Sequence, residues 1–174
     1  TGNFNEKTAR VYTDFSLFTR DPNITRETIS VFDLIQLPYR QQNFKHLMVS
    51  PINSKSAILA LIQQEIDNAK QGKPASIMVK VNNLVDFEII DKLYLASQSG
   101  VQIRGIVRGM CSLRPGIKGL SENITIISIV DRFLEHPRVM VFHNDGDPKV
   151  YISSADWMLR NMQNRIEVGC PVND

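Results

Sequence analysis

The sequence predicts an α/β domain built on a mixed sheet flanked by helices. Three observations support this: strands and helices alternate from about residue 45 onward, the joins between them are short, and the last third of the chain is rich in strand-like runs. We place this domain at residues 45–174. Residues 1–44 precede it as an arm, which ends in a linker-like stretch at residues 38–44.

The arm contains one predicted helix, over residues 23–37. Ile29, Phe32 and Ile35 recur there at helical spacing, and Thr25 is the predicted N-cap. The arm therefore predicts a helix that precedes the sheet.

The first half of the domain alternates strands with helices. The predicted segments are strand 46–50, helix 53–71, strand 76–81, helix 86–99 and strand 101–107. Gly72 and Gly100 follow the two helices, where a residue with positive φ often closes a helix. The second half is richer in strands, which we predict at residues 124–130, 138–143, 150–153 and 165–169. The alternation predicts parallel pairing in the first half of the sheet.

Composition narrows the function. The chain has 20 Lys and Arg against 18 Asp and Glu, a net charge of +2. Such a balance argues against holding nucleic acid by bulk charge, yet it allows a local basic pocket for a polyanion. Cys111 and Cys170 form no CxxC pair, no apolar run approaches a membrane span, and no secretion signal opens the chain. A reduced cytoplasmic protein is the simplest interpretation.

Arg108 is the first candidate for a phosphate ligand. It follows the predicted strand 101–107 directly and is followed by Gly109 and a long loop that reaches Asn123. Ligands of open α/β sheets gather at the carboxyl ends of strands, and a guanidinium pairs two phosphate oxygens at once. An ordinary surface ion pair is an equally good interpretation of this position alone.

His136 stands just before a predicted strand, in the stretch LEHPR, with Arg138 two residues further on. An imidazole can transfer protons or attack phosphorus near neutral pH. A lone histidine is nevertheless more often structural than catalytic, and His46 and His143 are both interpreted as structural.

Two small turns and one aromatic residue complete the set. Ser153 and Ser154 follow a predicted strand, where hydroxyls and amides can hold a phosphate or cap a short helix. Gly2 and Asn3 form a similar turn at the start of the chain. Tyr12 can stack on a base or pack in a core, and the sequence leaves both open.

Six stretches together resemble bacterial polyphosphate kinases of the large, histidine-phosphorylating type. They are TGNFNEKTARVYTD (1–14), LMVSPINS (47–54), VNNLVD (81–86), VRGMCSLRPG (107–116), ISIVDRFLEH (127–136) and KVYISSADWMLRNMQNRIEV (149–168). The stretches run in family order and span nearly the whole chain, which makes the resemblance specific.

The resemblance implies two phospholipase-D-like domains that bind phosphates between them. Residues 1–44 would be the end of the first domain with its linker, and residues 45–174 would be the second, catalytic C-terminal domain. The turns at Gly2-Asn3 and Ser153-Ser154 look like the family's versions of the phospholipase glycine–serine turn. The chain has His136-Pro137-Arg138 where those relatives have His-x-Lys.

The resemblance also implies a reaction. It is the reversible transfer of the terminal phosphate of ATP to inorganic polyphosphate, through a phosphohistidine and with Mg²⁺. Tyr12 would contact the nucleotide, Arg108 the phosphates, and His136 would be a second catalytic histidine that donates a proton to the leaving group. For the full-length enzyme it implies a bacterial cytoplasmic homo-oligomer, with any membrane association confined to that longer protein and no nucleic-acid partner.

The chain opens at Thr1 inside a loop-like motif, which predicts a piece of a longer polypeptide. The resemblance places the phosphorylated histidine, and the arginines that the family uses near its metal, upstream of Thr1. We therefore expect no metal ligands in this chain, weak binding of ATP/ADP or polyphosphate, and no turnover. Two rival functions remain, a phospholipase-D-like phosphodiesterase, which the missing lysine disfavours, and a non-catalytic polyanion-binding module.

Overall fold

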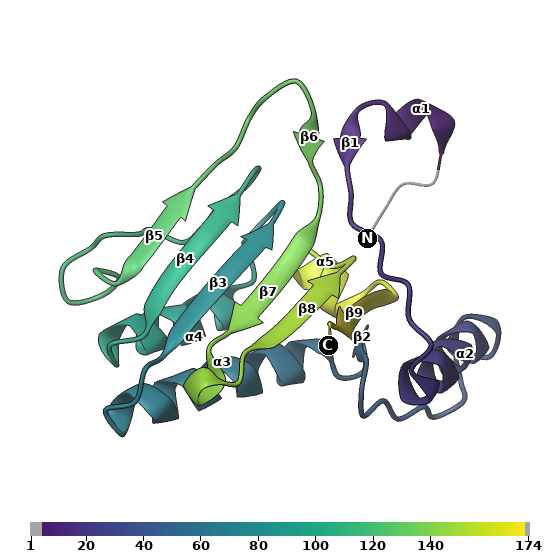
Figure 1. The fold of residues 1–174 in the computed structure, drawn as a ribbon, viewed down its shortest axis with the longest axis horizontal. Helices are drawn as coiled ribbons and strands as arrows, with labels where there is room; N and C mark the ends of the chain where they lie inside the picture. Colours follow the sequence, from purple (N-terminus) through teal and green to yellow (C-terminus); the bar gives the residue numbers. More distant parts are fainter. Residues whose placement is uncertain (1–4, 173–174) are drawn as a thin grey trace.

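The computed structural model describes residues 5–172, and a seven-stranded mixed sheet forms its centre (Figure 1). In spatial order the strands are β2 (Met48–Ser50), β9 (Glu167–Pro171), β8 (Lys149–Ser153), β7 (Arg138–Phe142), β3 (Ser76–Val81), β4 (Gln102–Val107) and β5 (Ile124–Ile127). β3, β4 and β5 pair in parallel, whereas β7, β8, β9 and β2 are joined in antiparallel pairs. The predicted mixed α/β fold is confirmed. The predicted parallel pairing of the first half holds for β3 and β4 but is wrong for β2, which lies at the other edge of the sheet and pairs antiparallel with β9.

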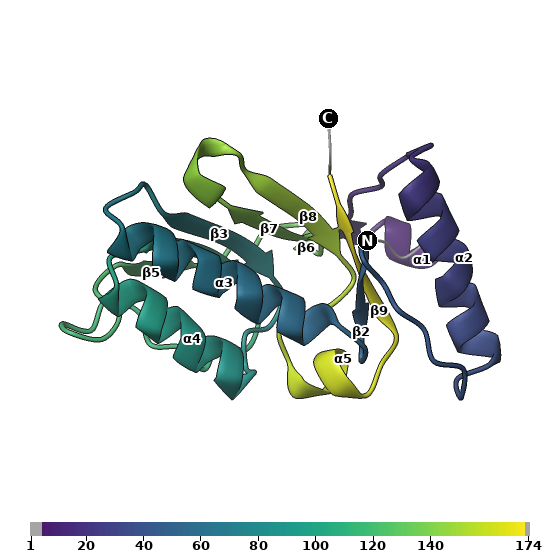
Figure 2. The same cartoon turned by 90° about the horizontal axis from the view of Figure 1, so that it is seen from below.

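Two helices cover one face of this sheet, α3 (Ser54–Lys70) and α4 (Phe87–Gln98) (Figure 2). Apolar side chains at helical spacing on both helices pack against the strands and form the main core. Gly72 and Gly100 follow the helices with φ of 72° and 95°, the left-handed conformation that glycine adopts without strain. The predicted helix ends are therefore correct to within about a residue.

A third long helix, α2 (Pro22–Gln36), belongs to the arm and begins earlier than predicted. Its N-cap is Asp21, whose carboxylate accepts a hydrogen bond of 2.7 Å from Asn23 N. The prediction of Thr25 as the N-cap was wrong, because Pro22 lacks an N–H and suits the first helical position. Thr25 instead lies in the first turn.

The apolar residues that recur at helical spacing in the sequence of α2 do not form its buried face. Ile29, Phe32 and Ile35 are 64%, 61% and 55% exposed. The buried residues of the helix are Ile24, Val31 and Leu34, which join Phe44, Leu47 and Val49 in a second hydrophobic cluster. The arm is thus fastened to the domain through β2.

Several short elements were not predicted. They are α1 (Glu6–Ala9), β1 (Tyr12–Thr13), β6 (Leu134–Glu135), the 3-10 helix η1 (Asn144–Gly146) and α5 (Leu159–Gln163). In addition, β5 ends at Ile127 and β9 begins at Glu167, so both differ from the predicted bounds by two or three residues. The long connection after Arg108 contains only one isolated bridge, at Cys111.

The β1–β6 pair places the arm beside the domain. It is a separate two-stranded parallel sheet in which Tyr12 pairs with Leu134 and Thr13 with Glu135. The backbone N–H of Leu134 donates to Val11 O at 2.8 Å. This pairing brings the residues after β1 against the segment that leads into β7.

Within the described residues no helix has both the length and the apolar character needed to cross a bilayer.

Candidate active site

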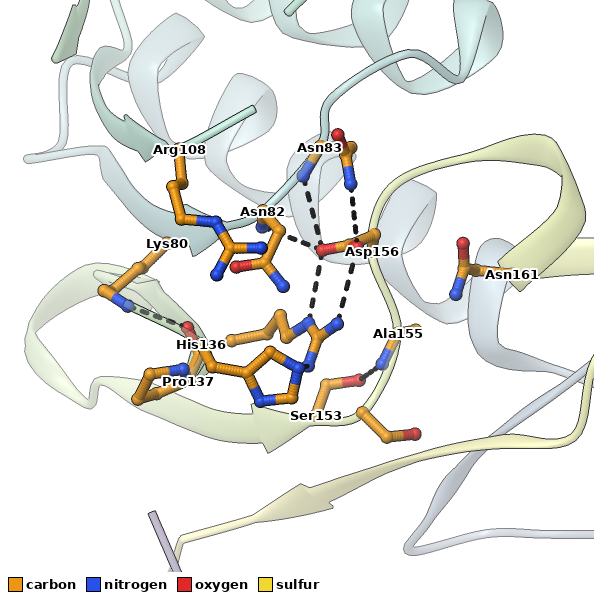
Figure 3. A network of polar contacts seen from close by, with 12 residues as sticks. Lys80, Asn82, Asn83, Arg108, His136, Pro137, Ser153, Ala155, Asp156 and Asn161 are labelled. Atoms are coloured by element: carbon orange, nitrogen blue, oxygen red, sulfur yellow. Dashed lines mark hydrogen bonds and ion pairs between the residues drawn. The ribbon is translucent and has the colours of Figure 1, made fainter. Parts of the chain in front are cut away.

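The candidate site lies at one edge of the main sheet, where the carboxyl ends of β3, β4 and β8 meet the start of β7. The register shows this arrangement, because Val81 pairs with Val107 and Arg138 pairs with Ser153. Polar side chains from all four strands gather at this edge (Figure 3). It is the edge at which open α/β sheets bind ligands.

His136 is held through both nitrogens of its ring. Its Nδ1 lies 2.6 Å from Asp14 Oδ1, and its Nε2 lies 3.0 Å from Arg138 Nη1. A carboxylate accepts and a guanidinium donates, so the neutral imidazole with its proton on Nδ1 satisfies both neighbours. The Tyr12 ring packs edge-on against the imidazole, with ring centroids 4.9 Å apart.

Arg138 is in turn held by Asp156. Its Nε and Nη2 donate to the two carboxylate oxygens at 3.2 and 3.4 Å. Both side chains are nearly enclosed, with exposures of 11% and 6%. A buried guanidinium needs such a partner, because an unpaired charge inside a protein is costly.

Asp156 gathers further donors from the end of β3. Asn82 N donates to it at 2.8 Å, and Asn83 donates through its backbone N and its side-chain amide at 3.3 and 3.1 Å. Burial raises the pKa of this carboxyl, but the hydrogen bonds and charge of Arg138, together with the two asparagines, outweigh burial and hold the pKa below its usual value. The carboxylate is therefore ionised at neutral pH and fixes Arg138 in place.

Arg108 approaches the same segment from β4. Its Nη1 donates to Glu135 O at 3.0 Å, which uses one of the five N–H donors of a guanidinium. Lys80 lies close by and donates to Pro137 O at 3.0 Å, with Glu135 Oε2 at 3.2 Å. In the orientation of its side-chain amide that satisfies its neighbours, Asn82 donates to Glu135 O and accepts from Arg138. Three cationic side chains thus surround residues 135–137.

The structure brings Tyr12, Arg108 and His136 together from three separate parts of the chain. The serine turn is engaged in local structure: Ser153 Oγ accepts from Ala155 N at 3.0 Å, and Ser154 Oγ contacts Glu167 and accepts from Val168 N. Gly2 and Asn3 fall outside the described residues. The bond at Ser153 caps no helix, because α5 begins at Leu159 with Met158 as its N-cap, so the alternative of a helix cap at this turn is wrong.

Asp14, Lys80 and Asp156 were not singled out from the sequence. Asp14 and His136 are 122 residues apart, and Asp156 and Asn82 are 74 apart, so no local spacing reveals either contact. One signal was available, since Asn82 and Asn83 directly follow a strand whose carboxyl end lies at the ligand-binding edge.

This arrangement can bind a string of negative charges and move a proton. Arg108 and Lys80 can stabilise charge on phosphate oxygens, and Arg138 directs an N–H toward the ring nitrogen that a leaving group would approach. Among residues 5–172 no group of three or more His, Cys, Asp and Glu side chains is placed to hold a metal ion.

Two family profiles match the chain. "Polyphosphate kinase C-terminal domain 1" matches residues 1–42, and "Polyphosphate kinase C-terminal domain 2" matches residues 47–174. Among curated proteins, the chain is 65% identical over its whole length to polyphosphate kinase of Vibrio parahaemolyticus and 58% identical to that of Escherichia coli. It spans about a quarter of the length of these relatives, 25% in both cases.

Solved structures give the same pattern. The crystal structure of polyphosphate kinase from Porphyromonas gingivalis superposes with a TM-score of 0.95 at 45% identity, covering 100% of this chain and 27% of that one. Nuc of Salmonella typhimurium, a phospholipase D family member, superposes with a TM-score of 0.50 at 13% identity and covers 71% of this chain and 78% of that one. The likeness to Nuc shows a shared fold alone, the phospholipase-D-like fold.

Proposed function

This chain belongs to the polyphosphate kinase family, and from that membership we propose that it holds nucleotide and phosphate groups while the terminal phosphate of ATP passes reversibly to inorganic polyphosphate. The observation that carries the proposal is the convergence of Tyr12, His136 and Arg108 at one edge of the sheet. The Tyr12 and His136 rings are in contact, and Arg108 binds the carbonyl of the residue before His136.

The resemblance to the family suggests a role for each residue, and the geometry is compatible with it. Tyr12 borders the site from the arm, with a ring able to stack on a base. Arg108 keeps free N–H donors and pairs phosphate oxygens. In its doubly protonated form His136 would donate the Nε2 proton to the leaving phosphate oxygen, which requires Arg138 Nη1 to move away from that nitrogen, and Asp14 is a positioning residue that holds Nδ1.

The phosphohistidine step requires a further nucleophile. His46 and His143 lie away from this edge, since His46 precedes β2 and His143 follows β7 at its far end. We assign the phosphorylated histidine to the sequence that precedes Thr1 in the longer relatives, and Mg²⁺ to that part as well. Residues 1–44 would then be the end of the first phospholipase-D-like domain and residues 45–174 the second.

It follows that the 174 residues alone should bind without turnover. Synthesis of polyphosphate from ATP by the purified chain, measured by the conversion of ATP to ADP and polymer, would overturn this part of the proposal. Both cysteines are free thiols, which fits the reducing bacterial cytoplasm.

The phosphate-binding role is tested by Arg108→Ala. We expect the affinity for ATP and for polyphosphate, measured by calorimetric titration, to fall roughly tenfold or more, because a charge-assisted hydrogen bond contributes about 1.5–3 kcal/mol. Arg104→Ala is the matched control, since Arg104 is an exposed arginine of the same strand, and it should leave both affinities within about twofold. Equal affinities for Arg108→Ala and wild type would remove Arg108 from the site.

A further inference from the structure

A second cationic feature lies where the arm joins the domain. A groove of about 580 Å³ runs between residues 38–42, which link α2 to the sheet, and residues 163–166 at the end of α5 and after it. Pro51 and Ile52, just after β2, complete it. We call this feature the linker groove.

The lining of the linker groove suits a chain of phosphates. Arg40 and Arg165 both line it, together with the side-chain amides of Gln41, Gln163 and Asn164, and none of its described lining residues is acidic. Neither guanidinium has a side-chain hydrogen bond or ion pair within residues 5–172. Ten N–H donors on two guanidiniums therefore remain available to an anion.

Two segments that line the linker groove, residues 51–52 and 164–166, adjoin strand ends at the same edge of the sheet as the candidate active site. β2 ends at Ser50, opposite the first residue of β9, and β8 ends at Ser153, which pairs with Gly169 of β9 and Arg138 of β7. From β4, which carries Arg108, to β2 there are five strand spacings, or about 24 Å at about 4.8 Å each.

A row of cations follows this edge. Arg108 stands after β4, Arg165 precedes β9 and Arg40 lies beyond β2 on the linker, whereas Arg138 at the start of β7 is already paired with Asp156. A ligand as short as a triphosphate cannot span such a distance. A long polyphosphate can span it. Once one part of the polymer is bound, each further contact forms within the same complex and raises the overall affinity.

We propose that the linker groove is a second subsite for inorganic polyphosphate, which receives phosphates far from the reacting end of the polymer. This inference rests on the proposed function, because it takes polyphosphate as the substrate of the edge. The lining, with two guanidiniums, several amides and no carboxylate, would suit any chain of phosphates. Tyr39, which is 82% exposed in the same groove, makes a nucleoside triphosphate the competing occupant.

The test compares ligands of different length on matched variants. Calorimetric titration with ATP, tripolyphosphate and long-chain polyphosphate would be carried out on wild type, on Arg40→Ala/Arg165→Ala, and on Arg26→Ala/Arg104→Ala. The last pair removes the same charge from two exposed arginines outside the groove. Unchanged thermal unfolding of each variant would verify that the fold is intact.

We expect the groove variant to lose at least about tenfold in affinity for long polyphosphate and to show a shallower salt dependence. Its affinities for ATP and tripolyphosphate should stay within about twofold, and the control pair should resemble wild type. Arg40→Glu should weaken long-chain binding further, because it places in the groove a negative charge that repels the phosphates.

The other outcomes separate the two proposals. Unchanged long-chain affinity in the groove variant, or an equal loss in the control pair, would overturn the subsite while leaving the active-site assignment in place. An equal loss for ATP would assign the groove to the nucleotide and also overturn the subsite. If wild type bound neither ATP nor polyphosphate, the proposed function itself would fail.

Discussion

At the level of single residues, the ion pair between Asp156 and Arg138 helps to hold the His136 ring in place. Arg138 contacts the ring of His136, and Asp156 contacts Arg138 and the end of β3. The orientation of the imidazole therefore depends on a carboxylate that never touches it.

Replacing that carboxylate should destabilise the fold. Asp156→Ala leaves the guanidinium of Arg138 nearly buried without its counter-charge, and breaking such a pair costs roughly 3–5 kcal/mol. Urea unfolding followed by the fluorescence of the buried Trp157 would measure the loss. Asp91→Ala, at an exposed carboxylate of α4, should change the free energy of unfolding by no more than about 0.5 kcal/mol. A similar small effect for Asp156→Ala would show that Arg138 does not need this partner.

The sequence could predict only part of this residue set. Arg108 is visible because a strand ends directly before it, and Tyr12 and His136 because their motifs resemble those of a family. Asp14 and Asp156 act through partners far away in the chain, and such contacts appear only when the β1–β6 pair and the main sheet are known.

At the level of elements, α2 is attached to the domain by one carboxylate as well as by apolar contacts. Glu27 accepts hydrogen bonds from the backbone N–H groups of Lys45, His46 and Leu47, at 2.8 to 3.2 Å. Burial raises the pKa of Glu27, but these three backbone donors outweigh it and lower the pKa below its ordinary value.

This attachment should depend on pH. Because the native pKa of Glu27 is lowered, its ionised form adds stability at neutral pH, and that contribution disappears as the pH falls through the native pKa. Wild type should therefore be more stable than Glu27→Gln at neutral pH, and the difference should vanish in acid. Urea midpoints measured across the acid range test this, with the exposed Glu122→Gln as control. A difference independent of pH would contradict the role of the charge.

The two faces of α2 give a second prediction. Leu34→Ala should cost roughly 2–5 kcal/mol, because it removes buried apolar volume. Phe32→Ser, on the exposed face, should cost less than about 1 kcal/mol. Thermal unfolding of the two variants is sufficient, and a larger loss for Phe32→Ser would reverse our assignment of the faces.

The sequence predicted the domain helices and strands of the first half well, since their apolar periodicity reflects burial on one sheet. It failed on α2, where Ile29, Phe32 and Ile35 form the more regular pattern and yet face outward. Periodicity identifies a helix but does not say which of two apolar faces is packed. The short strands β1 and β6 have two residues each, too few for any pattern to show.

At the scale of the whole molecule, residues 5–20 of the arm differ from the domain in how many side chains they bury. The main core lies between the sheet and helices α3 and α4, whereas residues 5–20 contribute no buried side chain. Tyr12 and Asp14 reach His136 beside the short β1–β6 pair.

This difference predicts an unequal pattern of amide hydrogen exchange. The N–H of Leu134, which bonds to Val11 O, should exchange much faster than that of Val79 in β3, because opening β1 exposes little apolar surface. Saturating ATP should slow the exchange at Leu134 and leave Val79 unaffected, since a ligand that bridges arm and domain stabilises the closed form. Equal protection of both amides without ligand would show that the arm is firmly docked.

Because β1 contains Tyr12 and directly precedes Asp14, the candidate site is complete only when β1 is paired with β6. Arg108, Lys80 and Arg138 belong to the sheet domain, whereas the aromatic ring and the carboxylate that contact His136 come from the arm, from Tyr12 in β1 and from Asp14 directly after it. A folded molecule with β1 undocked would retain its cations and lose its hold on the imidazole. It could still capture phosphates while being unable to orient a proton toward them.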